Sequence, residues 1–553
     1  MKYLDYIQSR SLKVIKRFNY IGAVFALLSL VTSVMPSLLP RPWYIQALIS
    51  SLAISVGYGL GLGFSSLIRW LTQTELSPRI KRPAWNILIP FIPVSIVLVV
   101  IKGTIWQNEV RGLIGVEKLD TINILLTIVT IALFTIVFIK LAKLTTKLSK
   151  KIIRIYSKKI PARLSVALAI LTSTTIIYLA ISGVLFSGFL NVADRIFGAR
   201  DGTTPDGVSI PTNPNKSGSA ESLISWDKIG FQGRRFVGGG PTKAQLTEYN
   251  GPDAEDPIRV YAGLSSANTA EARAELAVAE LKRTNAFDKD VLVIATATGT
   301  GWLDPYVMDS LEYMHNGKTA IVSQQYSYLP SWISFLVDQD RAHEAGRVLY
   351  DAVLEEWMKQ PQEQRPKLIA YGLSLGSFGA QDAFSGVNDI RRNLDGALFT
   401  GTPNEATLWR NITNNRDKES PEWQPVYRSA QSVKFASTKE DINKIHPVEN
   451  NDNPRILFLQ HANDPVVWFS FDLIFNKPDW LNEPRGRAVS PQTRWYPVIT
   501  FLQVGLDQAI AASAPLGEGH YYQDTAPHAW ASVAPPNHWT TEKSDKLSNY
   551  LLK

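Results

Sequence analysis

The sequence predicts a mostly parallel α/β sheet covered by helices, preceded by an all-α transmembrane bundle. Three observations lead to this fold class: long apolar stretches fill the N-terminal third of the chain, a segment rich in Gly, Pro and Ser follows them, and short β-rich runs then alternate with helical patterns. We therefore divide the 553 residues into a transmembrane region (1–195), a linker that leads into the sheet (196–256) and an α/β domain (257–553).

Five apolar stretches in the first region contain no Asp, Glu, Lys or Arg. A helix needs about 20 apolar residues to cross the hydrocarbon core of a bilayer, and the stretches are near or above this length. Buried helices of a soluble protein rarely give five such runs in succession. The sequence therefore predicts a multi-pass membrane protein whose partner is the lipid bilayer. The predicted spans are 20–40, 43–68, 85–101, 122–139 and 164–190.

The charge of the chain is divided unevenly. Residues 1–163 carry 22 Lys and Arg against 5 Asp and Glu, whereas the remaining residues carry 35 against 44. The excess of positive charge therefore belongs to the membrane region, where such charge orients the spans, and the predicted α/β domain is acidic. Because nucleic-acid binding requires a basic face on a folded domain, the sequence argues against a nucleic-acid partner.

Basic residues gather in alternate loops between the predicted spans. The segment 140–163 has nine Lys and Arg and no acidic residue, whereas the loops on the other side have Arg41 alone or mix bases with acids. The positive-inside bias then places the N-terminus in the cytoplasm. With five spans, the α/β domain lies on the extracytoplasmic side of the cell (inner or plasma) membrane. The other basic residues on the cytoplasmic side are Lys2, Arg10, Lys13, Lys16, Arg17, Arg69, Arg79, Lys81 and Arg82.

The residues from Arg200 to Ser219 mark a change of composition. They read RDGTTPDGVSIPTNPNKSGS, which is typical of a linker or an irregular surface segment. After them, short apolar runs alternate with amphipathic helical patterns, the clearest of which extends from Trp332 to Lys359. This alternation favours a mostly parallel sheet with helices on both faces. The predicted strands are Ile258–Ala262, Val291–Thr296, Ala320–Val322, Leu368–Gly372, Ala397–Thr400 and Ile456–Gln460.

A candidate nucleophile, Ser374, directly follows one of these strands. The chain reads Gly372-Leu373-Ser374-Leu375-Gly376, with a helix-compatible segment behind it. A serine on a sharp turn between strand and helix adopts a strained backbone, and larger residues two positions away would collide with it. The pattern therefore predicts a serine nucleophile, and the alternative is an ordinary glycine-rich turn.

A serine hydroxyl needs a base that takes its proton and an acid that orients the base. With a serine on such a turn, the acid and then the base follow later in the chain. Asp464 lies just after the strand at 456–460, and His520 stands in a turn of small residues. We therefore predict Ser374, Asp464 and His520 as the catalytic residues.

Three of the seven histidines follow Asp464 in the required order. His520 is the best placed of them. His528 is the next candidate for the base, although it and His538 stand in Pro-rich and Trp-rich surroundings that are typical of surface packing. We expect His461, just before the acid, to be structural.

Two backbone N–H donors must stabilise the negative oxygen that develops during acyl transfer. One candidate donor is the amide of Leu375, directly after the predicted nucleophile. We expect the other in the glycine-rich loop after the strand at 291–296. The alternatives for this loop are a simple turn or a phosphate-binding loop, but the Lys-Ser/Thr ending of a P-loop is missing. The candidates in the loop are Thr298, Gly299, Thr300 and Gly301.

The sequence gives little support to metal or cofactor chemistry. It contains no cysteine, which excludes disulfides, thiolate metal sites and a cysteine nucleophile. It also has no H-E-x-x-H pattern, and its histidines are scattered. We therefore expect no metal and no cofactor.

Five segments of the chain are distinctive: PSLLPRPW (36–43), SLISWDKIGFQGRRFV (222–237), TGTGWLDP (298–305), GLSLGSFGA (372–380) and GEGHYY (517–522). With them, the chain resembles a family of bacterial membrane-bound α/β-hydrolases, in which a multi-span membrane region precedes a catalytic domain. The resemblance implies an α/β-hydrolase-like fold and serine hydrolase activity. Two features depart from the expected pattern: Glu518 stands where a small residue or His is expected, and no clear strand separates Asp464 from His520.

These features predict a membrane-anchored serine hydrolase, of the esterase or lipase type, that acts on a small-molecule or lipid ester. An acyltransferase is one alternative, because the same residues can pass the acyl group to another acceptor when water is excluded. A non-catalytic scaffold or transport protein with a degenerate hydrolase domain is another. Spans without charged residues argue against transport, and the intact order of Ser, Asp and His argues against degeneracy.

Overall fold

The computed structural model describes residues 18–73, 78–445 and 455–553, which divide between two compact units. The N-terminal basic residues used above to orient the chain lie in 1–17, outside the described residues. We call the first unit the helical unit; its described residues are 18–73, 78–188, Phe471–Leu481 and Ala488–Ile510.

The second unit, which we call the sheet unit, comprises Phe189–Ser470, Asn482–Arg487 and Ala511–Lys553. This division differs from the domains that the sequence predicts. The predicted linker, 196–256, belongs to the sheet unit, where it carries helices α8 (Phe231–Gly238) and α9 (Lys243–Asn250). In addition, two segments of the predicted α/β domain belong to the helical unit.

Four described helices of the helical unit are long and apolar enough to cross a membrane. The first predicted span, 20–40, is helical only over Tyr20–Ser33, and Val34 caps its C-terminus. Its 14 residues rise about 21 Å, less than the hydrocarbon thickness of about 30 Å. The helices of the unit are α2 (Tyr20–Ser33), α3 (Trp43–Thr72), α4 (Pro78–Leu113), α5 (Thr121–Tyr156), α6 (Ala162–Leu179) and α19 (Ile499–Asp507), with a π-helical stretch (Ala180–Phe186) after α6.

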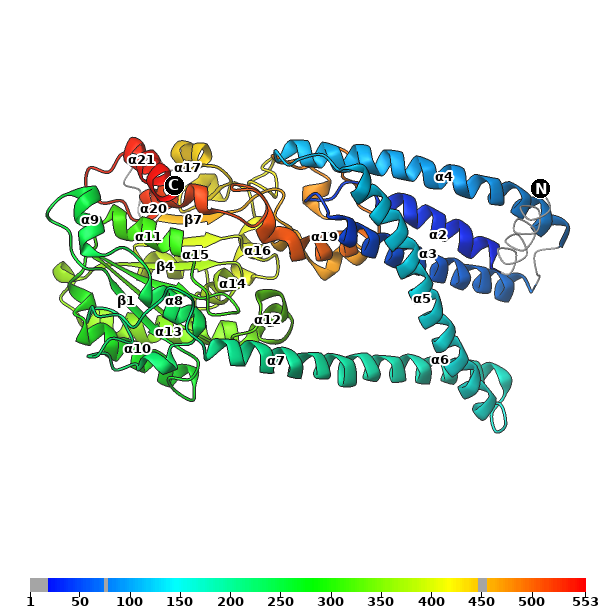
Figure 1. Ribbon diagram of the computed structural model, residues 1–553, viewed down its shortest axis with the longest axis horizontal. Coiled ribbons are helices and arrows are strands. Elements are labelled where there is room, and N and C mark those ends of the chain that lie inside the picture. The colour runs from blue at the N-terminus through cyan, green and yellow to red at the C-terminus, as the bar shows by residue number, and fades with distance from the viewer. Residues whose placement is uncertain (1–17, 74–77, 446–454) are drawn as a thin grey trace. The chain divides into compact units, whose positions relative to one another are not determined.

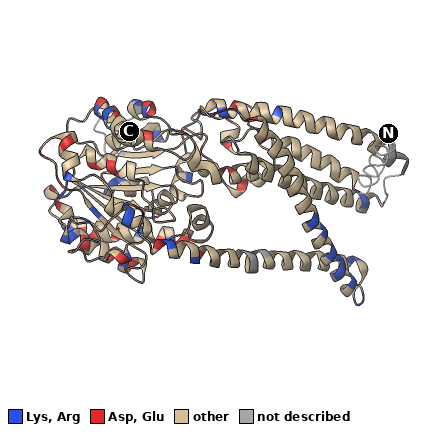
Figure 2. Ribbon diagram, viewed as in Figure 1, with Lys and Arg blue, Asp and Glu red and all other residues tan. Residues whose placement is uncertain are grey.

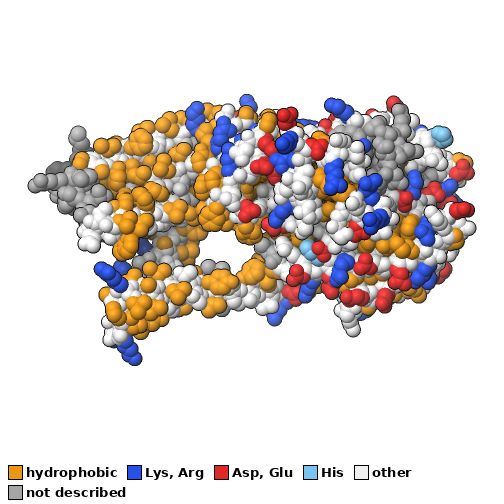
Figure 3. Space-filling model, turned by 180° about the vertical axis from the view of Figure 1, so that it is seen from behind, with side chains coloured by type: hydrophobic (Ala, Val, Ile, Leu, Met, Phe, Trp, Pro, Cys, Tyr) orange, Lys and Arg blue, Asp and Glu red, His pale blue; other side chains and the backbone are white. Residues whose placement is uncertain are grey.

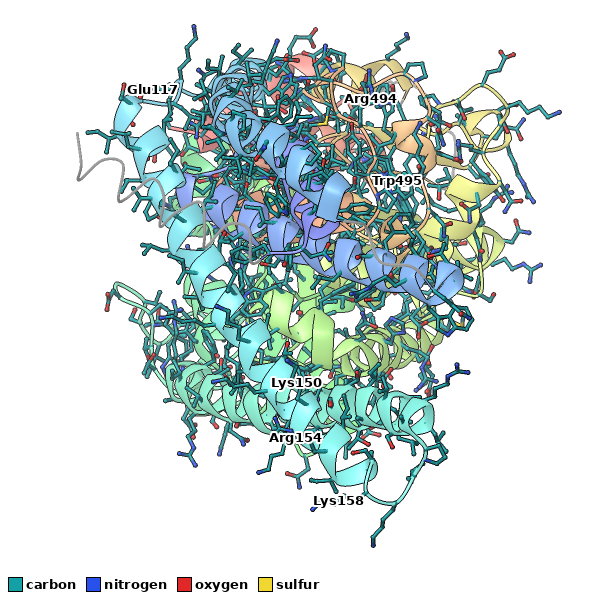
Figure 4. All side chains as sticks on the ribbon, turned by 90° about the vertical axis from the view of Figure 1, so that its right-hand side faces the viewer. Glu117, Lys150, Arg154, Lys158, Arg494 and Trp495 are labelled. Carbon is teal, nitrogen blue, oxygen red and sulfur yellow. The ribbon has the colours of Figure 1, made fainter. Side chains whose placement is uncertain are left out.

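The surface of the helical unit is apolar. Lys, Arg, Asp and Glu are sparse along its helices and dense over the sheet unit (Figure 2), and apolar side chains cover most of the face seen in Figure 3. Trp70 and Ile87 are 70% and 71% exposed. Exposed apolar surface of this extent is typical of helices that face lipid. The basic residues of 140–163 lie at one end of this surface, where Lys150 and Arg154 follow along α5 and Lys158 lies in the turn after it (Figure 4).

The described residues of the sheet unit form a seven-stranded sheet in the order β1-β3-β2-β4-β5-β7-β6, and every neighbouring pair is parallel. This confirms the predicted fold class. All residues of β1, β2 and β3 are buried, as expected where helices cover both faces of a parallel sheet. The sequence analysis missed β6, which has only four residues, including Lys434. The strands are β1 (Ile258–Ala262), β2 (Val291–Thr296), β3 (Thr319–Gln324), β4 (Lys367–Leu373), β5 (Gly396–Thr400), β6 (Val433–Ala436) and β7 (Arg455–Leu459).

Helices lie on both faces of the sheet (Figure 1). One layer contains α10 (Ala270–Arg283), α13 (Gln339–Lys359) and α14 (Leu375–Gln381), and the other contains α11 (Pro305–Met314), α20 (Ala526–Val533) and α21 (Thr541–Leu551). The pattern from Trp332 to Lys359 forms two helices rather than one, because Asp338 leaves the helical conformation and accepts hydrogen bonds from Ser327 and Ser334. The remaining helices of the chain are α7 (Ser187–Asp201), α10 (Ala270–Arg283), α11 (Pro305–Met314), α12 (Ser331–Val337), α13 (Gln339–Lys359), α14 (Leu375–Gln381), α15 (Val387–Asn393), α16 (Thr407–Asn414), α17 (Lys439–Ile445), α18 (Pro465–Trp468), α20 (Ala526–Val533) and α21 (Thr541–Leu551).

Candidate active site

Ser374 occupies the turn between β4 and α14, with a φ of 56° that L-residues rarely adopt. Its amide donates a 2.8 Å hydrogen bond to the carbonyl of Thr400 at the end of β5. The flanking glycines are required here: a Cβ at Gly372 would lie 2.5 Å from the carbonyl oxygen of Gly376, and one at Gly376 would collide with the carbonyl of Thr296. The local sequence therefore forms a strained turn that presents a serine at the carboxyl edge of the sheet.

Asp464 and His520 lie side by side at the same edge. Nδ1 of His520 donates a 2.6 Å hydrogen bond to Oδ2 of Asp464, whose Oδ1 accepts the amide of Val466 at 2.8 Å. The Asp464 side chain is fully buried. Since Asp464 occupies Nδ1, Nε2 of His520 is the nitrogen left to accept a proton. Nε2 is buried and forms no hydrogen bond with any residue in the described ranges.

Tyr522 is a further member of this cluster that the sequence analysis did not single out. Its hydroxyl donates to Oδ2 of Asp464 at 2.7 Å and accepts the amide of His461 at 3.0 Å. Burial raises the pKa of Tyr522 well above its ordinary value, so the hydroxyl keeps the proton that it donates. The only available signal was its position two residues after His520, within GEGHYY.

His461 supports the cluster from the other side. Its ring stacks on Tyr522 with the ring centres 4.1 Å apart, and its Nδ1 donates to the carbonyl of Gly519 at 2.8 Å. Burial lowers the pKa of His461 to about 4. The imidazole is therefore neutral at physiological pH and holds the turn that precedes His520.

Glu518 has a structural role of the same kind. Its carboxylate accepts hydrogen bonds from the side chains of Asn463 and Arg487, and Oδ1 of Asn463 accepts the amide of Gly519. These bonds join the turn before the acid to the turn before the base. The sequence also shows no clear strand between Asp464 and His520. The structure agrees, since residues 465–519 lie within the described part of the chain and form helices and turns without a strand.

His520 is placed close to the residues that hold Ser374. Gly401, which follows Thr400 at the end of β5, has a φ of 55°, and a Cβ there would lie 2.5 Å from Cε1 of His520. The His520 ring therefore packs over Gly401, which is next to Thr400, the residue whose carbonyl accepts the Ser374 amide. Because β4, β5 and β7 are neighbours in the sheet, the turns after them meet at one edge.

The loop of candidate oxyanion donors lies against the nucleophile turn, since the carbonyl of Thr296 touches Gly376. Within the loop, the amides of Thr298 and Gly301 donate to the carbonyls of Trp302 and Thr298 at 3.1 and 2.8 Å. These two amides are therefore occupied. The amides of Gly299 and Thr300 are the better donors in the loop.

The candidate donor outside this loop, the amide of Leu375, opens α14. The first N–H groups of a helix have no acceptor within the helix, so this amide can point at a ligand. The loop opposite it is held in place by Tyr261, whose hydroxyl donates to the carbonyl of Gly301 at 2.6 Å.

The other histidines that follow Asp464 do not join this cluster. His528 is buried in α20 with Nε2 3.3 Å from Asp545, and burial lowers its pKa to about 4. His538 lies beyond α20, where its carbonyl accepts a hydrogen bond from Lys543. Among the residues that the structure describes, no group of three or more His, Cys, Asp or Glu side chains is arranged to hold a metal ion.

Two family models match the chain. One, described as an alpha/beta-hydrolase family, matches residues 258–547, and another, described as the N-terminus of an alpha/beta-hydrolase family, matches residues 34–241. A search of curated proteins gave no match, and neither did a search of solved structures.

Proposed function

Because the chain belongs to the alpha/beta-hydrolase family, we propose that it is a membrane-anchored serine hydrolase that cleaves an ester or acyl substrate. The observation that carries this proposal is the 2.6 Å hydrogen bond between Asp464 and His520 at the edge where Ser374 occupies a strained turn. A buried carboxylate on Nδ1 leaves a basic Nε2, which is what a serine nucleophile requires.

In the proposed reaction, Nε2 of His520 takes the hydroxyl proton of Ser374 while Oγ attacks the carbonyl carbon of the substrate. Asp464 stabilises the imidazolium that forms. His520 then protonates the leaving alcohol, which departs and leaves an acyl-Ser374. Water, deprotonated by His520, attacks this acyl group; the bond between the acyl carbon and Oγ of Ser374 then breaks, and His520 returns the proton to Oγ as the acid leaves.

The negative oxygen of each tetrahedral intermediate needs donors that are already in place. We assign one to the amide of Leu375. The second is the amide of Gly299 or Thr300, since the amides of Thr298 and Gly301 bond within their own loop.

The proposed membrane location favours a lipid-like ester as substrate. The proposed orientation has a cytoplasmic N-terminus and an extracytoplasmic sheet unit, and it requires an odd number of spans. The described residues include four long apolar helices, which is an even number. The number of spans is odd only if α2, which packs on α3, also crosses the membrane. A topology reporter fused after Leu190 tests this, since activity of the reporter on the cytoplasmic side contradicts the orientation.

The hydrolase proposal is tested with a fluorophosphonate, which reacts covalently with an activated serine. We expect labelling of the full-length protein in membranes, loss of labelling in Ser374→Ala, and unchanged labelling in the control Ser385→Ala, which alters an exposed serine bonded to Asp389. Equal labelling of the wild type and Ser374→Ala contradicts the proposal.

A second measurement separates hydrolysis from transfer. A soluble ester is supplied with and without an added alcohol, and the free acid and the new ester are quantified. Free acid as the main product supports the hydrolase, whereas a new ester as the main product identifies an acyltransferase that uses the same residues.

A further inference from the structure

Two of the loops that the proposed reaction uses are joined by a pair of side chains outside the predicted triad. Asp304 follows the loop of candidate oxyanion donors, and Gln523 follows the turn that carries His520. The side-chain amide of Gln523 donates to both carboxylate oxygens of Asp304, at 2.9 and 3.0 Å. All of these residues belong to the sheet unit. The pair therefore connects the predicted donors to the predicted base within one compact unit.

Asp304 is fixed at the start of α11. Its side chain caps this helix by accepting the amide of Tyr306 at 3.0 Å, and Pro305 occupies the first helical position. Asp304 is only 5% exposed, and burial raises the pKa of its carboxyl group. A buried carboxylate is costly unless it accepts hydrogen bonds. The bonds from Tyr306 and Gln523 therefore stabilise its charge, and Asp304 is a strong acceptor for Gln523.

The donor loop has a second anchor in Tyr261 of β1. The hydroxyl of this fully buried residue donates to the carbonyl of Gly301 at 2.6 Å. Gly301 has a φ of 81°, and a Cβ at this position would lie 2.4 Å from the Tyr261 hydroxyl. Gly299 and Thr300, whose amides are the better donors, stand directly before Gly301 and Asp304. Their position therefore depends on both anchors.

Gln523 is equally close to the predicted base. It begins a 3-10 helix, Gln523–Thr525, three residues after His520. Tyr522, directly before it, donates to Asp464, and the hydroxyl of Thr525 donates to the carbonyl of Tyr522 at 3.0 Å. A displacement of Gln523 is therefore transmitted to Tyr522 and, through it, to the pair of Asp464 and His520.

Other contacts hold the same helix layer together. The indole N–H of Trp530 in α20 donates to the carbonyl of Val307 in α11 at 2.8 Å. The hydroxyl of Tyr306 donates to the carbonyl of Ser548 in α21 at 3.2 Å. These bonds remain when Gln523 is changed. The bond between Gln523 and Asp304 therefore has a more local effect, on the spacing between the donor loop and the base.

We propose that Asp304 and Gln523 are positioning residues for catalysis: their hydrogen-bonded pair sets the spacing between the oxyanion donors at 299–300 and His520. The inference rests on the proposed function, because it takes His520 as the base and Gly299 or Thr300 as a donor. In the proposed mechanism neither positioning residue binds the substrate. The donor and the base act on the same tetrahedral intermediate, so an error in their spacing lowers the rate of the chemistry without weakening substrate binding.

The experiment uses the full-length protein in membranes. It measures the fraction that a fluorophosphonate labels at saturation, and then kcat and KM for a short soluble ester, with kcat expressed per labelled molecule. Gln523→Leu removes the donor and keeps a side chain of similar size. We expect full labelling, a nearly constant KM and a kcat about tenfold lower, because displacements of an ångström cost large factors in rate. The control Tyr306→Phe removes the hydroxyl that bonds α11 to Ser548 and should keep the wild-type kcat.

Gln523→Glu gives a result that a purely structural role would not give. It places a second carboxyl group against Asp304, and two such groups in contact repel each other when both are ionised. We expect kcat to be about tenfold below that of the wild type at pH 8 and within about threefold at pH 6, where the two groups share a proton. Protonation of His520 lowers kcat in both proteins at pH 6, so the ratio of the two values is compared.

A double variant restores the bond in the opposite direction. Asp304→Asn combined with Gln523→Glu exchanges the donor and the acceptor, and an asparagine can still cap α11. We expect it to recover most of the wild-type kcat at pH 8. A kcat no higher than that of Gln523→Glu alone overturns the inference.

The remaining outcomes are also decisive. A lower kcat at full labelling and constant KM, absent from Tyr306→Phe, supports positioning. A fall in the labelled fraction with wild-type kcat per labelled molecule overturns the inference, because the pair then serves folding alone. An unchanged kcat, or a change confined to KM, overturns it as well.

Two further results keep the test clear. If Gln523→Leu does not fold, Gln523→Glu decides, and a ratio to the wild type that is equal at pH 8 and pH 6 overturns the inference. If labelling of the wild type does not depend on Ser374, the proposed function itself fails and the inference falls with it.

Discussion

The turn around Ser374 and the pair of Asp464 and His520 are assembled differently. The turn is held by its own neighbours, Gly372 and Gly376, with one hydrogen bond to Thr400. The pair joins segments 56 positions apart. The predicted nucleophile is thus held by a few adjacent residues, whereas the position of the predicted base depends on all the residues that pack against its loop.

This difference has a consequence for mutations. Changes near Ser374 should act only when they touch the turn itself. Changes that affect the predicted base should extend to residues that surround Asp464, such as Tyr522, and to residues that hold the turn before His520, such as Asn463.

The largest effect is expected from Asp464→Asn. The amide keeps the shape of the side chain but can present its NH2 group to His520, which favours the imidazole tautomer that cannot accept the serine proton. We expect kcat on a soluble ester to fall by about 10⁴. Combining this change with His520→Ala should add little, since the residues act as a unit. A fall in kcat of less than tenfold for Asp464→Asn contradicts the assigned role.

The turn itself is tested by Gly376→Ala. The added Cβ collides with the carbonyl of Thr296, and the turn must shift. We expect a loss of about 10² in kcat, because the hydroxyl of Ser374 moves relative to its base. Gly188→Ala is the matched control, since nothing lies within 4 Å of a Cβ at that position. Wild-type kcat in Gly376→Ala shows that the turn tolerates the methyl group and contradicts its tight fit.

A smaller effect is expected from Tyr522→Phe. This change removes the hydroxyl that donates to Asp464 and accepts from the amide of His461. The loss of a hydrogen bond to a charged group costs about 1.5–3 kcal/mol. Asp464 keeps its bonds from His520 and Val466, so we expect the lower end of this range, a fall in kcat of about tenfold. KM for a short soluble ester should stay nearly constant, because Tyr522 does not bind the substrate in the proposed mechanism. A change confined to KM contradicts this role.

The smallest expected effect on the reaction comes from His315, which lies away from the predicted triad. Its Nε2 donates to the carbonyl of Ala534, and burial lowers its pKa to about 4 from 6.5. The unfolded chain therefore binds a proton more readily than the folded one as the pH falls from about 6.5 to about 4. Over that range this histidine removes up to about 3 kcal/mol from the free energy of unfolding.

The variant His315→Gln retains the hydrogen-bond donor and cannot take up that proton. Thermal unfolding followed between pH 7 and pH 4.5 should show a smaller loss of stability in this variant, with kcat at pH 7 close to that of the wild type. Equal pH dependence in the two proteins contradicts burial of a neutral His315.

Features that depend on local chemistry could be predicted from the amino-acid sequence. Strand and helix patterns identified the parallel sheet, and small residues around Ser374 identified a turn that larger residues could not form. The expected order of Ser, Asp and His along the chain also led to the prediction of Asp464 and His520, whose side chains lie within hydrogen-bond distance in the structure. These features are local because backbone geometry and side-chain periodicity leave a pattern over a few residues.

Features that depend on packing between distant segments could not be predicted from the sequence and became evident in the folded chain. From the sequence, Arg41 is expected to be a charged residue of an exposed loop, yet its side chain is buried and forms an ion pair with Asp507. Tyr522 reads as one aromatic residue among many, yet it binds the predicted acid. A buried charge or hydroxyl without a partner costs free energy in the protein interior, so such groups pair with each other. These pairs cannot be predicted from the sequence, because the interior exists only after the chain has folded.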